Sequence, residues 1–151
     1  MNPHIKALRS GRKLVQNSVD SYSLDQLNKI PEGFKNNLIW NVGHVIVAQQ
    51  SIVYRGSGLP LYVSDALFDQ FKPGSKPERD LTQEEVDHLR ILLHSLPDQL
   101  EADLEKGLFT QYTERTTVTG FHLASLEDAL IFNNYHEGMH MGYMLAMRKL
   151  V

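Results

Sequence analysis

Cysteine is absent from the 151 residues, which excludes disulfide bonds, thiolate metal ligands and a cysteine nucleophile. No apolar run approaches the roughly 20 residues that cross a bilayer, and the N-terminus lacks the apolar core of a signal peptide. With 15 basic and 18 acidic residues, the chain shows no electrostatic footprint for nucleic acid. We therefore expect a cytoplasmic protein with neither membrane nor nucleic-acid partners, whose metal ligands, if any, are histidines, carboxylates or water.

Hydrophobic residues make up 42% of the chain, and both this share and the length are typical of one globular domain spanning residues 1–151. Apolar periodicity and capping residues predict four long helices, over about residues 3–20, 37–55, 82–104 and 125–149. In the first of these, Lys and Arg are expected on the solvent side. The second is apolar nearly all round, which indicates a buried helix.

The three connections between these helices are long, and each contains a predicted short element. These are helical turns at 24–28 and 65–70 and a hairpin that begins at 111–118. Pro97 is expected to kink or split the third long helix. Four long helices with long connections predict an all-α four-helix bundle, in which a crossover allows the second and third helices to run parallel.

Two of the seven histidines, His136 and His140, stand four residues apart in the last predicted helix. Residues i and i+4 lie on one face of a helix, so both imidazoles can reach a single metal ion. Neutral imidazole is the commonest metal ligand in proteins. The same stripe continues through Asn133, Tyr143 and Met147 without a charged residue, which indicates that it faces the interior.

A metal site needs a third ligand, and His44 is the best candidate because it lies inside the strongly apolar second helix. An imidazole without a partner would pay a desolvation penalty there. Spacing alone leaves a second interpretation open, a core histidine satisfied by a backbone carbonyl or a side chain. The remaining histidines lie near termini, on polar helix faces or in loops, and most are expected to be solvated: His4, His88, His94 and His122.

Two segments carry a resemblance to a known family: NNLIWNVGHVIVAQQ in the second helix and SLEDALIFNNYHEGMHMGYM in the fourth. They resemble the signature segments of the DinB/YfiT-like superfamily, small bacterial four-helix bundles with a three-histidine metal site. In that pattern one histidine comes from the second helix and a His-x-x-x-His pair from the fourth. These positions correspond to His44, His136 and His140. Tyr143 stands where family members often carry glutamine.

The resemblance implies a metal-dependent enzyme, either a transferase that uses a low-molecular-weight thiol or a hydrolase. Three imidazoles leave a coordination position for water, as catalytic sites do. The all-nitrogen donor set suits zinc, nickel, iron or copper. By helical spacing, Asn41 and Tyr143 are candidates for positions behind the ligands or in the pocket, although ordinary packing would explain both. The resemblance also implies a homodimer.

Two further interpretations remain open. His136, Glu137 and His140 fit the zincin metallopeptidase motif, with Glu137 as general base. Zincins take their third ligand from downstream, however, and no His, Asp or Glu follows His140. Glu137 is therefore a weak catalytic candidate, expected to face solvent or to lie behind a ligand. A metal-binding or stress-related bundle without turnover is the other alternative, and it would show a closed site or none, whereas an enzyme needs a substrate cleft.

Overall fold

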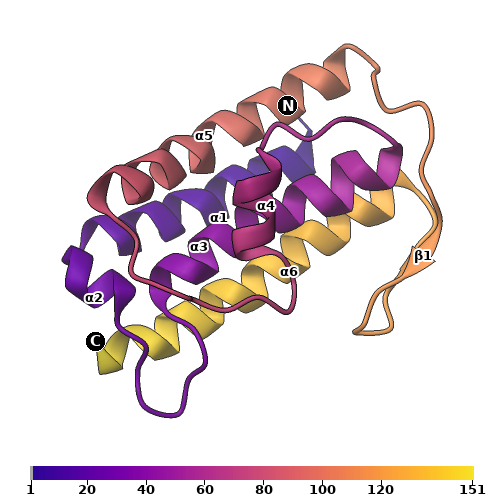
Figure 1. Cartoon of the computed structure of the whole chain (residues 1–151). Helices are drawn as coiled ribbons and strands as arrows, with labels where there is room; N and C mark the ends of the chain where they lie inside the picture. The colour runs from indigo at the N-terminus through magenta and orange to yellow at the C-terminus, as the bar shows by residue number, and fades with distance from the viewer. Residues whose placement is uncertain (1) are drawn as a thin grey trace.

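The computed structural model describes residues 2–151 and contains four long helices arranged as a bundle (Figure 1). They are α1 (Pro3–Asp20), α3 (Leu38–Gln49), α5 (Gln83–Glu105) and α6 (Leu126–Met147). Both α1 and α3 pack against α5 and α6. Figure 1 shows that α3 and α5 run in one direction and α1 and α6 in the other. The predicted all-α bundle with a crossover is confirmed.

Short elements occupy the long connections. They are α2 (Leu24–Asn28), α4 (Asp65–Phe71) and the antiparallel strands β1 (Arg115–Thr116) and β2 (His122–Leu123). Single helical turns of other types extend α3 through Gln50–Tyr54 and Arg55–Ser57, and α6 through Arg148–Leu150. The connection from α3 to α5 carries α4, which packs on α3. No helix within residues 2–151 has the length and apolar character to span a membrane.

Side-chain caps explain why the long helices begin where the sequence predicts. The Asn2 and Asn37 side chains accept hydrogen bonds from backbone N–H groups in the first turns of α1 and α3. Thr82 forms a reciprocal capping box with Glu85, and Ser125 caps α6. Each cap satisfies a backbone donor that lacks a partner within the helix.

Proline does not split α5. Pro97 lies inside one continuous helix of 23 residues and is buried. A proline removes one backbone donor and crowds the preceding turn, but most helical stability in a folded protein comes from packing of the apolar face. The buried leucines on both sides of Pro97, Leu93 and Leu100 among them, hold the helix together. A split at Pro97 is therefore excluded.

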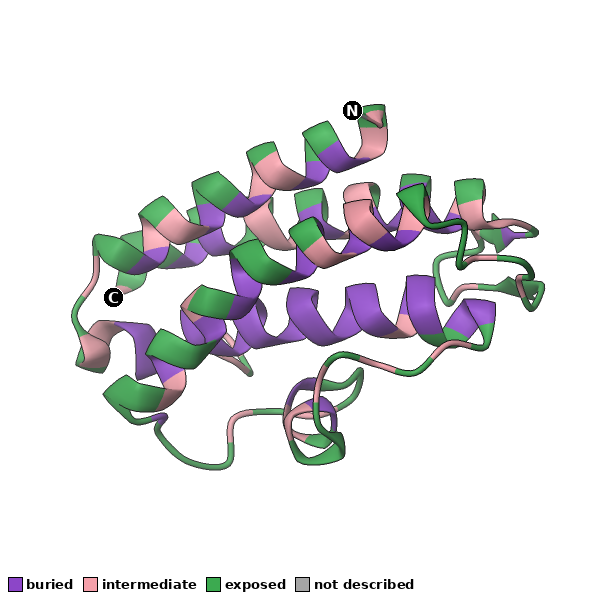
Figure 2. Cartoon of the chain, turned by 90° about the horizontal axis from the view of Figure 1, so that it is seen from above, coloured by how far each residue is buried: buried purple, intermediate pink, exposed green. Residues whose placement is uncertain are grey.

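The helix at the centre of the bundle is α3, where every residue from Leu38 to Gln49 is buried. Figure 2 shows it purple along nearly its whole length. It contacts α5, α6 and α4, which together cover it. This enclosure forces the polar side chains of α3 either to find partners or to line a site.

One basic residue of α1 is not on the solvent side. Arg12 is fully buried and continues the stripe of Leu8 and Val15. Its guanidinium donates to both carboxylate oxygens of Glu137 on α6, at 2.7 and 2.8 Å. The expectation that the basic residues of this helix face solvent is therefore wrong for Arg12.

Candidate metal centre

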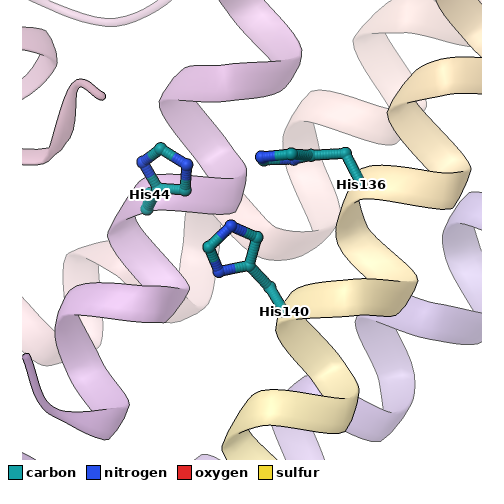
Figure 3. Close-up of side chains that lie close together, drawn as sticks. All are labelled: His44, His136 and His140. Carbon is teal, nitrogen blue, oxygen red and sulfur yellow. The ribbon is translucent and has the colours of Figure 1, made fainter. Parts of the chain in front are cut away.

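Three imidazoles from two helices meet between α3 and α6 (Figure 3). His44 comes from α3, and His136 and His140 come from consecutive turns of α6. The centroids of the His44 and His140 rings are 4.6 Å apart, those of His136 and His140 4.6 Å, and those of His44 and His136 5.3 Å. One nitrogen atom from each ring lies within 4.8 Å of the other two. The structure thus places together three histidines that are up to 96 residues apart (140 − 44).

The Nδ1 atom of His44 lies 2.8 Å from the backbone carbonyl oxygen of Phe71, the last residue of α4. A carbonyl oxygen only accepts hydrogen bonds, so Nδ1 is the protonated nitrogen. The Nε2 atom of His44 is then left with a free lone pair. Of the two interpretations of His44, this bond satisfies one nitrogen, as in a core histidine, and leaves the other available as a ligand.

The orientation of His140 is set by Asn41. The Asn41 amide nitrogen donates to the carbonyl of Asn37 at 2.8 Å and to the side chain of Asn36 at 2.9 Å. The Asn41 Oδ1 atom therefore faces His140 and accepts a hydrogen bond from its Nδ1 atom at 2.8 Å. Like His44, His140 is left with an unprotonated Nε2 atom. Ligand histidines commonly donate their second nitrogen in this way.

His136 is held differently. Its Nδ1 atom is buried and has no hydrogen-bond partner among the described residues. Its ring is in contact range of Phe132, one turn earlier in α6, with centroids 6.0 Å apart. This imidazole is therefore confined by packing rather than by a hydrogen bond, and its tautomer is free to adapt.

Burial keeps all three imidazoles neutral. It lowers the pKa of His136 to about 4 and that of His140 to about 3, compared with an ordinary value of 6.5, and the neighbouring imidazoles lower both further. Burial also lowers the pKa of His44, against the opposing effect of the Phe71 carbonyl. Neutral imidazoles are the form that binds metal.

The cluster fits a divalent metal ion by its donor set. Nitrogen ligands about 2.0–2.1 Å from one zinc ion lie about 3.4 Å from one another. Ligand atoms already within 4.8 Å of each other reach that spacing with small side-chain rotations. His136 and His140 remain partly exposed, whereas His44 is buried. The two histidines of α6 are therefore the part of the cluster that solvent reaches.

Aromatic residues surround the cluster. The Trp40 indole stacks on the His44 ring, with centroids 4.8 Å apart and planes 10° from parallel. Trp40 and Phe71 also line a cavity of about 540 Å³ beneath α4, whose lining includes none of the three histidines. Tyr143 is 39% exposed and packs edge-to-face on Phe34. Tyr143 follows His140 by about one turn of α6, and no hydrogen bond joins it to the three histidines.

Glu137 is not solvent-facing. It is 7% exposed, both of its oxygens are bound by Arg12, and Oε1 also accepts from Asn133 at 3.0 Å. These bonds occupy the carboxylate that the zincin motif would require as a general base. Of the two positions expected for Glu137, facing solvent or behind a ligand, the first is therefore wrong.

The remaining histidines lie outside the cluster. His88, His94 and His122 are exposed, as expected, and His4 is half-buried against Glu127 at 2.7 Å. Two contacts in this region were not predicted, that of the Phe71 carbonyl with His44 and that of Arg12 with Glu137. The Phe71 carbonyl leaves no trace in the sequence, because any residue supplies one. The position of Arg12 in the apolar stripe of α1 could have indicated from the sequence that its side chain is buried.

Fold and site together define a class of protein: a four-helix bundle with three convergent histidines, one from α3 and two from α6. A family model described as the DinB superfamily matches residues 7–144. The chain therefore belongs to the DinB superfamily, and the predicted family is confirmed. No curated protein matches the chain closely enough to supply a relative.

Proposed function

We propose that this protein is a metal-dependent enzyme, a transferase that uses a low-molecular-weight thiol or else a hydrolase. The observation that carries the proposal is the set of three neutral imidazoles within 4.8 Å, two of them partly exposed. When bound, a divalent ion such as zinc, nickel or iron lowers the pKa of a thiol or of water and so supplies a nucleophile at neutral pH.

The residues of the chain would prepare and hold this site. His44, His136 and His140 supply the ligand nitrogens. Asn41 and the Phe71 carbonyl hold two of the rings in the tautomer that binds metal. In transfer, the thiol loses its proton to solvent, and its sulfur bonds to an electrophilic carbon of the second substrate as the leaving group departs. In hydrolysis, water takes the place of the thiol.

Metal content tests the site directly. The untagged protein is expected to bind about one divalent ion per chain, and His44→Ala and His140→Ala are expected to lose it while keeping a helical circular dichroism spectrum. His94→Ala, an exposed histidine of α5, is the matched control and should bind as the wild type does. Retention of metal by the two cluster variants would refute the site.

Turnover tests the enzyme. The metal-loaded protein should transfer a small thiol to an electrophilic acceptor, or hydrolyse an activated substrate, and His140→Ala should not. Metal binding without either reaction would favour the alternative, a metal-binding bundle without turnover. Two observations support that alternative: the 540 Å³ cavity is not lined by the histidines, and the carboxylate of Glu137 is engaged by Arg12.

We also propose that the chain forms a homodimer through α1 and α6. Between these helices lie two adjoining grooves of about 220 and 250 Å³, which share Leu14 and Met141. Leu14 is 55% exposed and Leu145 38%. Light scattering after size-exclusion chromatography should give twice the chain mass for the wild type, and the chain mass for Leu14→Glu with Leu145→Glu. Ile91→Glu, on the exposed side of α5, should leave the dimer intact.

A further inference from the structure

The C-terminal end of α4 rests directly on the backbone of α3 at Gly43. A Cβ atom added to Gly43 would lie 2.4–2.6 Å from three atoms of the Phe71 ring. Such distances are too short for non-bonded carbon atoms, whose favourable separation is about 3.5–4.0 Å. The Phe71 ring is 2% exposed, so it cannot simply swing into solvent without losing its packing. Residue 43 must therefore lack a side chain for α4 to dock in this position.

The same residue of α4 also binds the neighbouring residue of α3. The Phe71 carbonyl is one of the last four of α4, which have no N–H partner within their own helix. It accepts the Nδ1 proton of His44 at 2.8 Å. The Phe71 ring on Gly43 and the Phe71 carbonyl at His44 are thus two consequences of one docking position.

A second contact from this segment controls the plane of the His44 ring. The indole Nε1 atom of Trp40, which stacks on His44, donates to the Ser75 hydroxyl at 3.2 Å. The Ser75 hydroxyl in turn donates to the carbonyl of Gln70 at 3.0 Å. The end of α4 and the turn after it therefore hold one ring nitrogen directly and the ring face through Trp40.

We propose that Gly43 is a positioning residue for the metal centre: by admitting the Phe71 ring, it places the Phe71 carbonyl on Nδ1 of His44 and so presents Nε2 to the metal. This inference rests on the metal site of the proposed function. It assigns to α4 a role in metal binding, although α4 contributes no ligand. A residue that merely keeps the helix intact at position 43 does not suffice, because its side chain would occupy the space of the Phe71 ring.

Zinc affinity, measured by competition with a chromogenic chelator, tests the proposal. Gly43→Ala is expected to bind zinc about 10–100-fold more weakly, as is usual when a partner of a ligand histidine is lost. The control is Gly11→Ala in α1, where an added Cβ meets no atom within 4 Å. Both changes place a better helix former in a helix, so a difference between them reports the contact with Phe71. Equal affinity of Gly43→Ala and wild type would overturn the proposal.

A second substitution adds a rescue. In Gly43→Ala combined with Phe71→Ala the ring that collides is gone while the backbone carbonyl remains, so zinc affinity should recover relative to Gly43→Ala alone. If Gly43 served stability alone, removal of the buried Phe71 ring would destabilise the protein further and zinc affinity would not recover. No recovery, in a folded double variant, would count against the positioning role.

The tautomer of His44 gives a readout that needs neither metal nor activity. Two-bond ¹H–¹⁵N correlations of the metal-free wild type should show the proton on Nδ1, and Gly43→Ala should lose this preference. A proton on Nε2 in the wild type would overturn the proposal even if Gly43→Ala did not fold. If the wild type binds no metal but shows the Nδ1 proton and its loss in Gly43→Ala, the proposed function fails and the positioning of His44 by Gly43 stands.

Discussion

His136 and Glu137 are consecutive residues of α6 and belong to two very different polar clusters. Glu137 and Arg12 form a buried ion pair in which both carboxylate oxygens are bound. The imidazoles of His44, His136 and His140 are neutral, and His44 and His140 each use only one nitrogen in a hydrogen bond. The Glu137 carboxylate thus has both oxygens bonded within the fold, whereas His44 and His140 each keep a nitrogen that a ligand can use.

The difference separates a structural polar cluster from a functional one. A buried charge requires a partner, because an unpaired charge in the interior costs several kcal/mol. An imidazole can avoid this cost by giving up its proton, which the lowered pKa values of His136 and His140 reflect. A neutral imidazole then keeps a lone pair that a metal ion can use. Substitutions in the Arg12–Glu137 cluster should therefore mainly lower stability, and substitutions in the histidine cluster should mainly weaken metal binding.

The largest effect on stability is expected from breaking the ion pair. Arg12→Ala leaves the Glu137 carboxylate buried without its partner and should lower the free energy of unfolding by about 3–5 kcal/mol. Urea denaturation followed by circular dichroism measures this. Arg12→Met with Glu137→Met removes both charges at similar volume and should recover most of the loss while still binding zinc. A double variant that is as unstable as Arg12→Ala, or that binds no zinc, would contradict the assignment of the Arg12–Glu137 pair to structure and of the histidines to metal binding.

Metal addition should act on the histidine cluster alone. Zinc at 100 times its dissociation constant is expected to raise the free energy of unfolding by about 2.7 kcal/mol, because the folded state binds it. A chelator should reverse the effect, as followed by the thermal midpoint. His44→Ala should show no zinc-dependent stabilisation. An equal gain in that variant would mean that zinc binds elsewhere.

The hydrogen bond from His140 to Asn41 can be tested without touching a ligand. Asn41→Ala removes the acceptor of the Nδ1 proton and should weaken zinc binding about 10–100-fold. Asn17→Ala, an exposed asparagine of α1, is the control and should bind normally. Unchanged affinity in Asn41→Ala would show that the bond does not support the site.

The smallest effect is expected from an exposed ion pair, which sharpens the contrast with the buried one. Arg79 and backbone hydrogen bonding at Thr82 lower the pKa of Glu85 to about 2, from an ordinary 4.5. A lowered folded-state pKa adds stability above pH about 4.5, and this is lost as the pH falls toward about 2. Arg79→Ala should raise the Glu85 pKa, measured by carboxyl ¹³C NMR titration, with little change in stability at pH 7 because solvent screens the pair. A loss as large as that of Arg12→Ala would contradict the role given to burial.

Much of the fold was accessible from the sequence because local bonds define it. The caps Asn2, Asn37, Thr82 and Ser125 bond within their own first turns, so the helix starts are encoded by a few consecutive residues. The turn at 24–28 begins with a capping box of the same kind. Of the two effects expected of Pro97, a kink or a split, the split was wrong because the packing that holds α5 together comes from residues distant in sequence.

In the candidate site, too, some features follow from local sequence and others from tertiary packing. The spacing of His136 and His140 by itself determined that their imidazoles share one face of α6, since helical geometry places i and i+4 together. Only the tertiary structure decided that His44 meets them and that Arg12 binds Glu137. It also decided that the Phe71 carbonyl accepts a hydrogen bond from Nδ1 of His44, and Asn41 from Nδ1 of His140. Each of these contacts joins residues 27 to 125 positions apart, where periodicity carries no information and only the packing of one helix on another sets the distance.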